Sequence, residues 1–227
     1  MSAFTIIIEN QTTTDGRTYN ILAAPPLVSG GANPPVRPVT WHQTFPPLPP
    51  GSQAEFVFTD ELFAFAGTAD ASSSAALQSS DTIVIRSSAP VRWNSRFNNS
   101  SQLAVGTDLS LREYASAAAR GSFQVTADAS HPTPNNRVVG LARTHDSDGR
   151  DPVPVAAIEL KPGVTYTLSP SLAVWVLGGV SSVGDIQDAP IPGARDAALV
   201  EFSGAFNTAI VRERNNGTFQ VEYRVQG

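Results

Sequence analysis

The residues best suited to chemistry in this sequence are a histidine and an arginine, each close to a tryptophan. His42 follows Trp41 in a short run between proline-rich segments, and Arg96 lies three positions after Trp93. An imidazole titrates near neutral pH and can act as a general acid or base. A guanidinium can donate paired hydrogen bonds to a carbonyl or an oxyanion. We therefore predict His42 and Arg96 as catalytic candidates, the alternatives being a surface histidine and a surface ion pair.

Aromatic residues around these positions suggest the walls of a binding pocket. Trp41 and Trp93 border loops and have polar neighbours, whereas Trp175 lies in an apolar run typical of a core strand. Small-molecule sites are lined mostly by hydrophobic and aromatic side chains with a few polar groups. The predicted substrate-binding residues are Trp41, Phe45, Trp93, Phe97, Tyr19 and Tyr114. The alternative is that these rings only fill one end of the fold.

One acidic string has the character of a metal-binding loop. Residues 145–151 hold three aspartates around Gly149, and carboxylate oxygens are ligands that calcium prefers. The string lacks the later bidentate glutamate of such loops, and Pro152 follows at once. A solvated acidic turn is therefore the favoured interpretation, and we predict no metal site.

Several classes of protein are excluded or disfavoured by what the sequence lacks. There is no cysteine, so disulfides, thiolate nucleophiles and cysteine-ligated metals are excluded. Neither a phosphate-binding Gly-x-x-x-x-Gly-Lys loop nor a Gly-x-Gly-x-x-Gly turn occurs, and we predict no cofactor. The formal net charge is −5, which disfavours nucleic-acid binding, since that needs a concentrated basic face.

The start of the sequence bears on localisation. Met1 leads within a few residues into an apolar run, with no basic segment or cleavage site of a secretory signal. No stretch approaches the roughly 20 apolar residues that span a bilayer. These features predict a cytoplasmic protein that does not bind membranes.

Glycine and proline punctuation predicts the fold class. The 227 residues include 17 glycines and 18 prolines, mostly between short apolar runs, as in proteins of many short strands. We predict an all-β antiparallel sandwich or barrel of about a dozen strands. Hairpins are predicted for 4–9 with 17–24, for 53–59 with 62–67, and across Asn215-Asn216-Gly217. The alanine-rich segment 108–120 is predicted as one short helix, with Asp108 as its N-cap.

Two halves of the sequence resemble each other. Leu48-Pro49-Pro50-Gly51 and Leu160-Lys161-Pro162-Gly163 each open an apolar run, and Phe4-Thr5-Ile6 is similar to Phe123-Gln124-Val125. This internal similarity predicts two β pseudo-repeats, 1–120 and 121–227, packed together as one compact domain.

The first predicted hairpin carries a family resemblance. Phe4-Thr5-Ile6-Ile7-Ile8-Glu9-Asn10-Gln11, followed by Arg17-Thr18-Tyr19-Asn20-Ile21-Leu22, resembles small fungal β-proteins that include the hetero-Diels–Alderases of tropolone-sesquiterpene biosynthesis. The resemblance implies a cofactor-independent pericyclase of natural-product biosynthesis, and it supplies no catalytic motif. Its substrates would be a reactive quinone methide and an alkene.

The residues are compatible with such chemistry. A cycloaddition gains mainly from holding its two partners in the reactive orientation, and a hydrogen-bond donor to the carbonyl of the heterodiene lowers the barrier further. We assign the donor to Arg96 and acid–base catalysis to His42. The expected partner is a small apolar molecule, and a homodimer is one option for assembly. Two other functions stay open: a non-catalytic lectin-like or small-ligand-binding sandwich, and a structural assembly protein.

Overall fold

The computed structural model describes residues 2–30, 34–70, 77–79, 81–94, 99–118, 121–132, 136–144, 151–188 and 196–225. Within these ranges the chain forms nineteen strands and no helix. The all-β prediction is confirmed, with more strands than the predicted dozen. Each of the four sheets has two edge strands and does not close into a barrel, so of the two predicted architectures the fold is consistent with the sandwich. In the same ranges no helix is long and apolar enough to cross a membrane.

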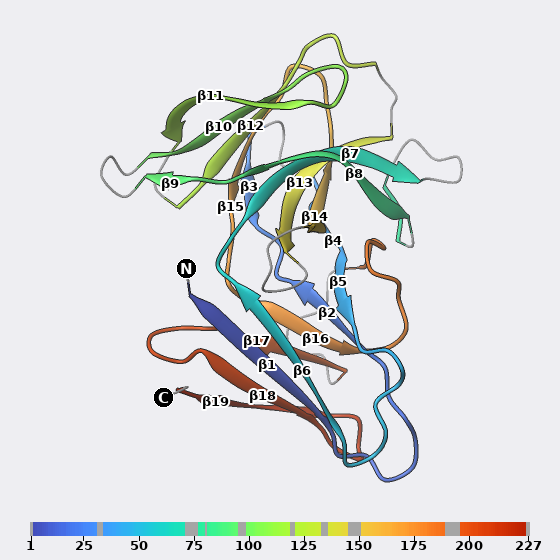
Figure 1. Ribbon diagram of the computed structural model, residues 1–227. Coiled ribbons are helices and arrows are strands. Elements are labelled where there is room, and N and C mark those ends of the chain that lie inside the picture. The colour runs from blue at the N-terminus through green and yellow to red at the C-terminus, as the bar shows by residue number, and fades with distance from the viewer. Residues whose placement is uncertain are drawn as a thin grey trace.

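Two sheets form the lobe that carries both chain termini, here called the first lobe (Figure 1). One sheet has the order β19-β18-β1-β6, with bounds Phe219–Arg224, Thr208–Glu213, Ala3–Asn10 and Gln53–Thr59. The other has the order β17-β16-β2-β5, with bounds Ala197–Val200, Val174–Gly178, Tyr19–Ala23 and Thr40–Gln43. Apolar side chains at alternate positions of β1, among them Ile6 and Ile8, are buried in the core.

The other two sheets form the second lobe. One has the order β11-β10-β12-β15-β3, with bounds Leu111–Ala118, Asn99–Val105, Phe123–Ala127, Thr165–Ser169 and Leu27–Ser29, and β9 (Trp93–Asn94) pairs with β10. The other has the order β4-β14-β13-β7-β8, with bounds Arg37–Pro38, Pro152–Glu159, Arg137–Thr144, Phe63–Asp70 and Thr82–Pro90. The proline-rich segment 25–38 thus supplies only the short edge strands β3 and β4, as expected where prolines interrupt hydrogen-bond ladders.

The two lobes share one strand order, and each lobe takes strands from both halves of the sequence. In chain order, β1, β2, β5 and β6 correspond to β12, β13, β14 and β15, and β7, β8, β10 and β11 correspond to β16, β17, β18 and β19. Each lobe also contains one parallel pair, β1 with β18 and β12 with β10. The predicted division at residue 120 falls between β11 and β12, but the strands of the two halves are exchanged between the lobes.

Besides the excursion of β3 and β4 into the second lobe, the chain crosses between the lobes twice. Residues 60–62 connect β6 to β7, and residues 170–173 connect β15 to β16. We call these the crossover segments (Figure 1). A single hydrophobic cluster continues through all four sheets, from Ile6 of the first lobe to Val125 of the second.

The predicted helix over 108–120 is wrong, since Leu111–Ala118 forms β11, paired antiparallel with β10. Helix propensity favours alanine by less than about 1 kcal/mol per residue, and the backbone ladder offered by β10 outweighs it. Asp108 caps no helix; its Oδ1 accepts a hydrogen bond from the Ser110 backbone N–H at 3.0 Å. A tight turn follows in which Leu109 has a φ of 64°.

Two of the predicted hairpins are also wrong, whereas the third is confirmed. β1 and β2 lie in different sheets, as do β6 and β7. β18 and β19 pair across Asn215-Asn216-Gly217, where Gly217 has a φ of 74° and the Arg214 N–H donates to the Thr218 carbonyl at 2.9 Å. The Asn-Gly turn depends on neighbouring residues and is visible in the sequence. The pairing of β1 and β6 with their partners depends on residues far apart in the chain, so the sequence does not show it.

Candidate functional site

Trp41, predicted as a pocket wall, is wholly buried in the core. Its ring packs edge-on against Phe56 and Phe58, with centroids 4.7 and 5.1 Å away, and its Nε1 donates to the Thr144 carbonyl at 3.2 Å. His42 follows it on β5, is half-buried, and stacks on Phe56 at 4.7 Å. These contacts make Trp41 a core residue and leave only His42 partly accessible.

Tyr19 is likewise a core residue. Its hydroxyl donates to Glu213 Oε2 at 2.7 Å, and both side chains are buried. Burial, followed by the hydrogen bond to Glu213, raises the pKa of Tyr19 well above its ordinary value. The contact joins β2 to β18, so its role is to hold the two sheets of the first lobe together.

The remaining predicted residues lie apart from these. Phe45 is 85% exposed, and Tyr114 is 57% exposed on β11 in the second lobe. Trp93 pairs with Ser100 through its backbone on β9. Arg96, Phe97 and residues 145–150 of the acidic string fall outside the described part of the chain. Within the described part, no group of acidic, histidine or cysteine side chains has the arrangement of a metal site. The structure does not gather the predicted set into one pocket.

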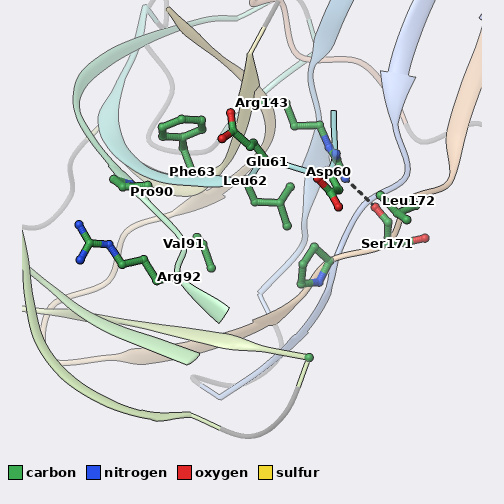
Figure 2. Close-up of a pocket in the computed structure, with 12 residues that line it drawn as sticks. Asp60, Glu61, Leu62, Phe63, Pro90, Val91, Arg92, Arg143, Ser171 and Leu172 are labelled. Atoms are coloured by element: carbon green, nitrogen blue, oxygen red, sulfur yellow. Dashed lines mark hydrogen bonds between the residues drawn. The ribbon is translucent and has the colours of Figure 1, made fainter. Parts of the chain in front are cut away.

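A pocket of about 650 Å³ instead lies where the two crossover segments meet. Its apolar walls come from both crossovers and from the end of β8, and Val91 donates a backbone hydrogen bond to the Leu62 carbonyl at 2.8 Å. Figure 2 shows Leu62 and Val91 at the centre of the group, with Arg92 extending away from it. The lining residues are Asp60, Glu61, Leu62, Phe63, Pro90, Val91, Arg92, Gly121, Arg143, Pro170, Ser171 and Leu172.

The most unusual lining residue is Arg143 of β13, which is only 2% exposed. Its Nη1 donates to the Thr59 carbonyl at 3.2 Å and its Nη2 to the Ser171 carbonyl at 3.0 Å. Figure 2 places its guanidinium beside Asp60 and Ser171. One arginine therefore bonds to the residue before the first crossover and to a residue within the second.

Arg143 is buried as a cation that forms no ion pair with a described carboxylate. Among the described residues no carboxylate forms an ion pair with it, and its Nε has no hydrogen-bond partner. Burial lowers the pKa of Arg143 to about 10, while the charge of Asp60 opposes this shift. The guanidinium is still protonated at neutral pH. The guanidinium lies next to two aromatic rings: its central carbon is 5.7 Å from the Trp41 ring centroid and 5.9 Å from the Phe58 ring centroid.

Acidic residues at the pocket are more exposed than Arg143. Asp60 and Glu61 are half-buried, and Asp60 Oδ1 accepts a hydrogen bond from the Ser2 backbone N–H at 3.0 Å. Arg92 is exposed at the opposite side. The buried charge in this pocket is therefore positive, whereas its negative charges are open to water.

Sequence reasoning missed this pocket because its residues come from five separate segments. The sequence shows the apolar runs after each Pro-Gly turn, yet nothing local indicates that residues 60–62 meet residues 170–173. One signal was present: Arg143 ends a run of apolar residues, 138–142, that reads as a buried strand. A charged residue in such a run is a candidate for a functional role.

Comparisons with family models, curated proteins and solved structures found no match to this chain.

Proposed function

We propose that this protein binds a small apolar molecule in the pocket between its crossover segments. The observation that carries the proposal is the pocket itself, about 650 Å³ in volume and walled by Leu62, Val91 and Leu172. Ligand sites of about 300–1,000 Å³ with apolar walls and few polar groups are typical of small-molecule binding. The place where two lobes meet is also a common position for such sites.

Native mass spectrometry with calorimetry tests the proposal. A panel of apolar polyketide–terpenoid compounds and a panel of oligosaccharides are titrated into the protein. Leu172→Trp adds bulk at the pocket wall and is expected to abolish binding of the apolar compounds. Val180→Trp is the matched control, because Val180 is 84% exposed and does not line the pocket. Binding that survives Leu172→Trp, or binding of sugars alone, would contradict the proposal.

Catalysis of a hetero-Diels–Alder cycloaddition is the second candidate. It rests on the resemblance of the first strands, and one feature of the pocket favours it. Apolar walls would hold the diene and the alkene together, and the guanidinium of Arg143 would donate to the carbonyl of the heterodiene. In this version of the hypothesis Arg143 takes the role that the sequence suggested for Arg96.

A product analysis tests this candidate. A quinone methide precursor and a sesquiterpene alkene are incubated with the protein, and the ratio of stereoisomers is measured by chromatography. Wild type and Val180→Trp are expected to give one dominant isomer, and Leu172→Trp the mixture of the uncatalysed reaction. The same mixture from all three proteins would remove the cyclase hypothesis and leave a binding protein.

The lectin-like alternative gains no support from Trp41 or Trp175. Sugar sites stack on exposed aromatic rings, but Trp41 is fully buried and Trp175 is 6% exposed.

A further inference from the structure

We propose that the ligand of the crossover pocket carries a carboxylate and that Arg143 receives this group. The inference rests on the proposed binding function and adds the chemical class of the ligand. Its basis is a buried guanidinium at the wall of an apolar pocket, held in place by backbone carbonyls and, among the described residues, without a carboxylate at ion-pair distance.

The bonding of Arg143 leaves donors for a ligand. A guanidinium has five N–H groups, and among the described residues the carbonyls of Thr59 and Ser171 each accept from one of its nitrogens. In the described part of the chain Nε has no acceptor, although it is buried. Buried donors without acceptors are uncommon, and each such case calls for an explanation. A carboxylate fits because it can accept two parallel hydrogen bonds from one guanidinium.

The position of Arg143 is also preorganised. Its two backbone bonds fix the plane of the guanidinium, and the rings of Trp41 and Phe58 restrict it on the side. A donor that is already held in its bound orientation loses little conformational entropy when the ligand arrives.

The correspondence between the lobes indicates that the fold itself does not require this arginine. Both β2 and β13 have a bulge in their pairing, after Ile21 and after Leu141 respectively. Aligning the bulges matches Arg143 to Ala23, which is 1% exposed in the core of the first lobe. One lobe therefore buries a methyl group where the other buries a cation beside a pocket.

The acidic side chains nearby do not favour a cationic ligand. Asp60 and Glu61 are half-buried and reach water, which screens their charge, whereas Arg143 is almost completely shielded. Coulombic interactions are stronger where water is excluded, so the buried positive charge dominates recognition inside the pocket.

Three probes with one hydrocarbon tail test the inference: decanoate, decan-1-ol and decylamine, measured by isothermal titration calorimetry at neutral pH. Decanoate is expected to bind wild type ~10- to 100-fold more tightly than decan-1-ol, from hydrogen bonds to a charged group. In Arg143→Met, decanoate and decan-1-ol should bind with similar affinity, and the affinity for decan-1-ol should equal that of wild type. Arg143→Lys keeps the charge without the forked donors, and it should recover only part of the advantage. Arg86→Ala, at an exposed arginine of β8 that does not line the pocket, is the control and should leave the ratio of decanoate to decan-1-ol binding unchanged.

The outcomes separate the two proposals. Equal binding of decanoate and decan-1-ol, or tightest binding of decylamine, overturns the carboxylate inference and leaves the apolar pocket standing. A decanoate preference that survives in both Arg143 variants overturns the role of Arg143. Binding of none of the three probes to wild type overturns the proposed function itself. The comparison of decanoate with decan-1-ol needs no variant, so it stands even if an Arg143 variant fails to fold.

Discussion

The guanidinium carbon of Arg143 lies 5.7 Å from the centre of the Trp41 indole, and this contact joins the two halves of the sequence. The indole Nε1 in turn donates to the carbonyl of Thr144, the next residue after Arg143. Trp41 therefore supports the wall of the crossover pocket from within the core. This is a different role from the ligand-contacting wall that the sequence suggested.

Arg143→Met is expected to leave the fold intact and to lower the free energy of unfolding by about 1–2 kcal/mol. The loss of two hydrogen bonds leaves the Thr59 carbonyl without its donor in a buried place, but removing an unpaired buried charge offsets part of the cost. Urea denaturation followed by circular dichroism measures the change. A loss of more than about 4 kcal/mol would instead make Arg143 primarily a structural brace.

Tyr19→Phe is expected to destabilise the protein at pH 7 by about 1–2 kcal/mol, because buried Glu213 then loses its donor. The effect depends on pH. Unfolded tyrosine releases its proton near pH 10, whereas the raised pKa keeps Tyr19 protonated in the folded state. Above about pH 10 the unfolded state binds fewer protons, so this part of the stability is present below pH 10 and falls as the pH rises.

The stability difference between wild type and Tyr19→Phe should therefore narrow from about pH 9 to pH 11. Urea denaturation at several pH values follows it, and other tyrosines cancel because they are common to both proteins. Tyr114→Phe, at an exposed position, is the control and should run parallel to wild type. A constant difference across this range would show that the Tyr19 hydroxyl does not resist ionisation.

Gly140→Ala is expected to lower the free energy of unfolding by about 3 kcal/mol or more, since overpacking against backbone cannot be relieved by a rotamer change. A Cβ at this position in β13 would lie 1.9 Å from the Ala156 carbonyl oxygen and 2.8 Å from a ring carbon of Phe65. Gly178→Ala is the matched control, because nothing lies within 4 Å of its added Cβ. Thermal unfolding should show a large drop in Tm for the first variant and little change for the second.

Separating the chain between Ala118 and Gly121 tests the strand exchange. Each lobe needs strands from both halves, so neither half alone should give a folded monomer. Mixing the two halves should restore a 1:1 complex with the circular dichroism spectrum of the whole chain. Size-exclusion chromatography with light scattering distinguishes this complex from self-association. A folded monomer from either half alone would contradict the exchanged arrangement.

Local features of the sequence predicted the class of fold and one of its turns. Alternating apolar residues between glycines and prolines indicated strands, since the side chains of a strand point to its two faces in turn. Asn215-Asn216-Gly217 predicted its hairpin because the preference for a positive φ is a property of those residues themselves. The internal similarity of the halves was also visible in residues such as Phe4 and Phe123.

Tertiary structure alone decided which strands pair and where the pocket lies. Segment 111–118 is a strand because it pairs with β10. β1 and β2 lie in different sheets, where β1 pairs with β18 and β6, and β2 pairs with β16 and β5. Trp41 looked like a pocket residue by its polar neighbours, yet it is enclosed by Phe56, Phe58 and Arg143. Contacts between residues distant in sequence depend on the packing free energy of the whole core. No local pattern records that energy, so the meeting of the two crossovers at Arg143 emerged only in the folded chain.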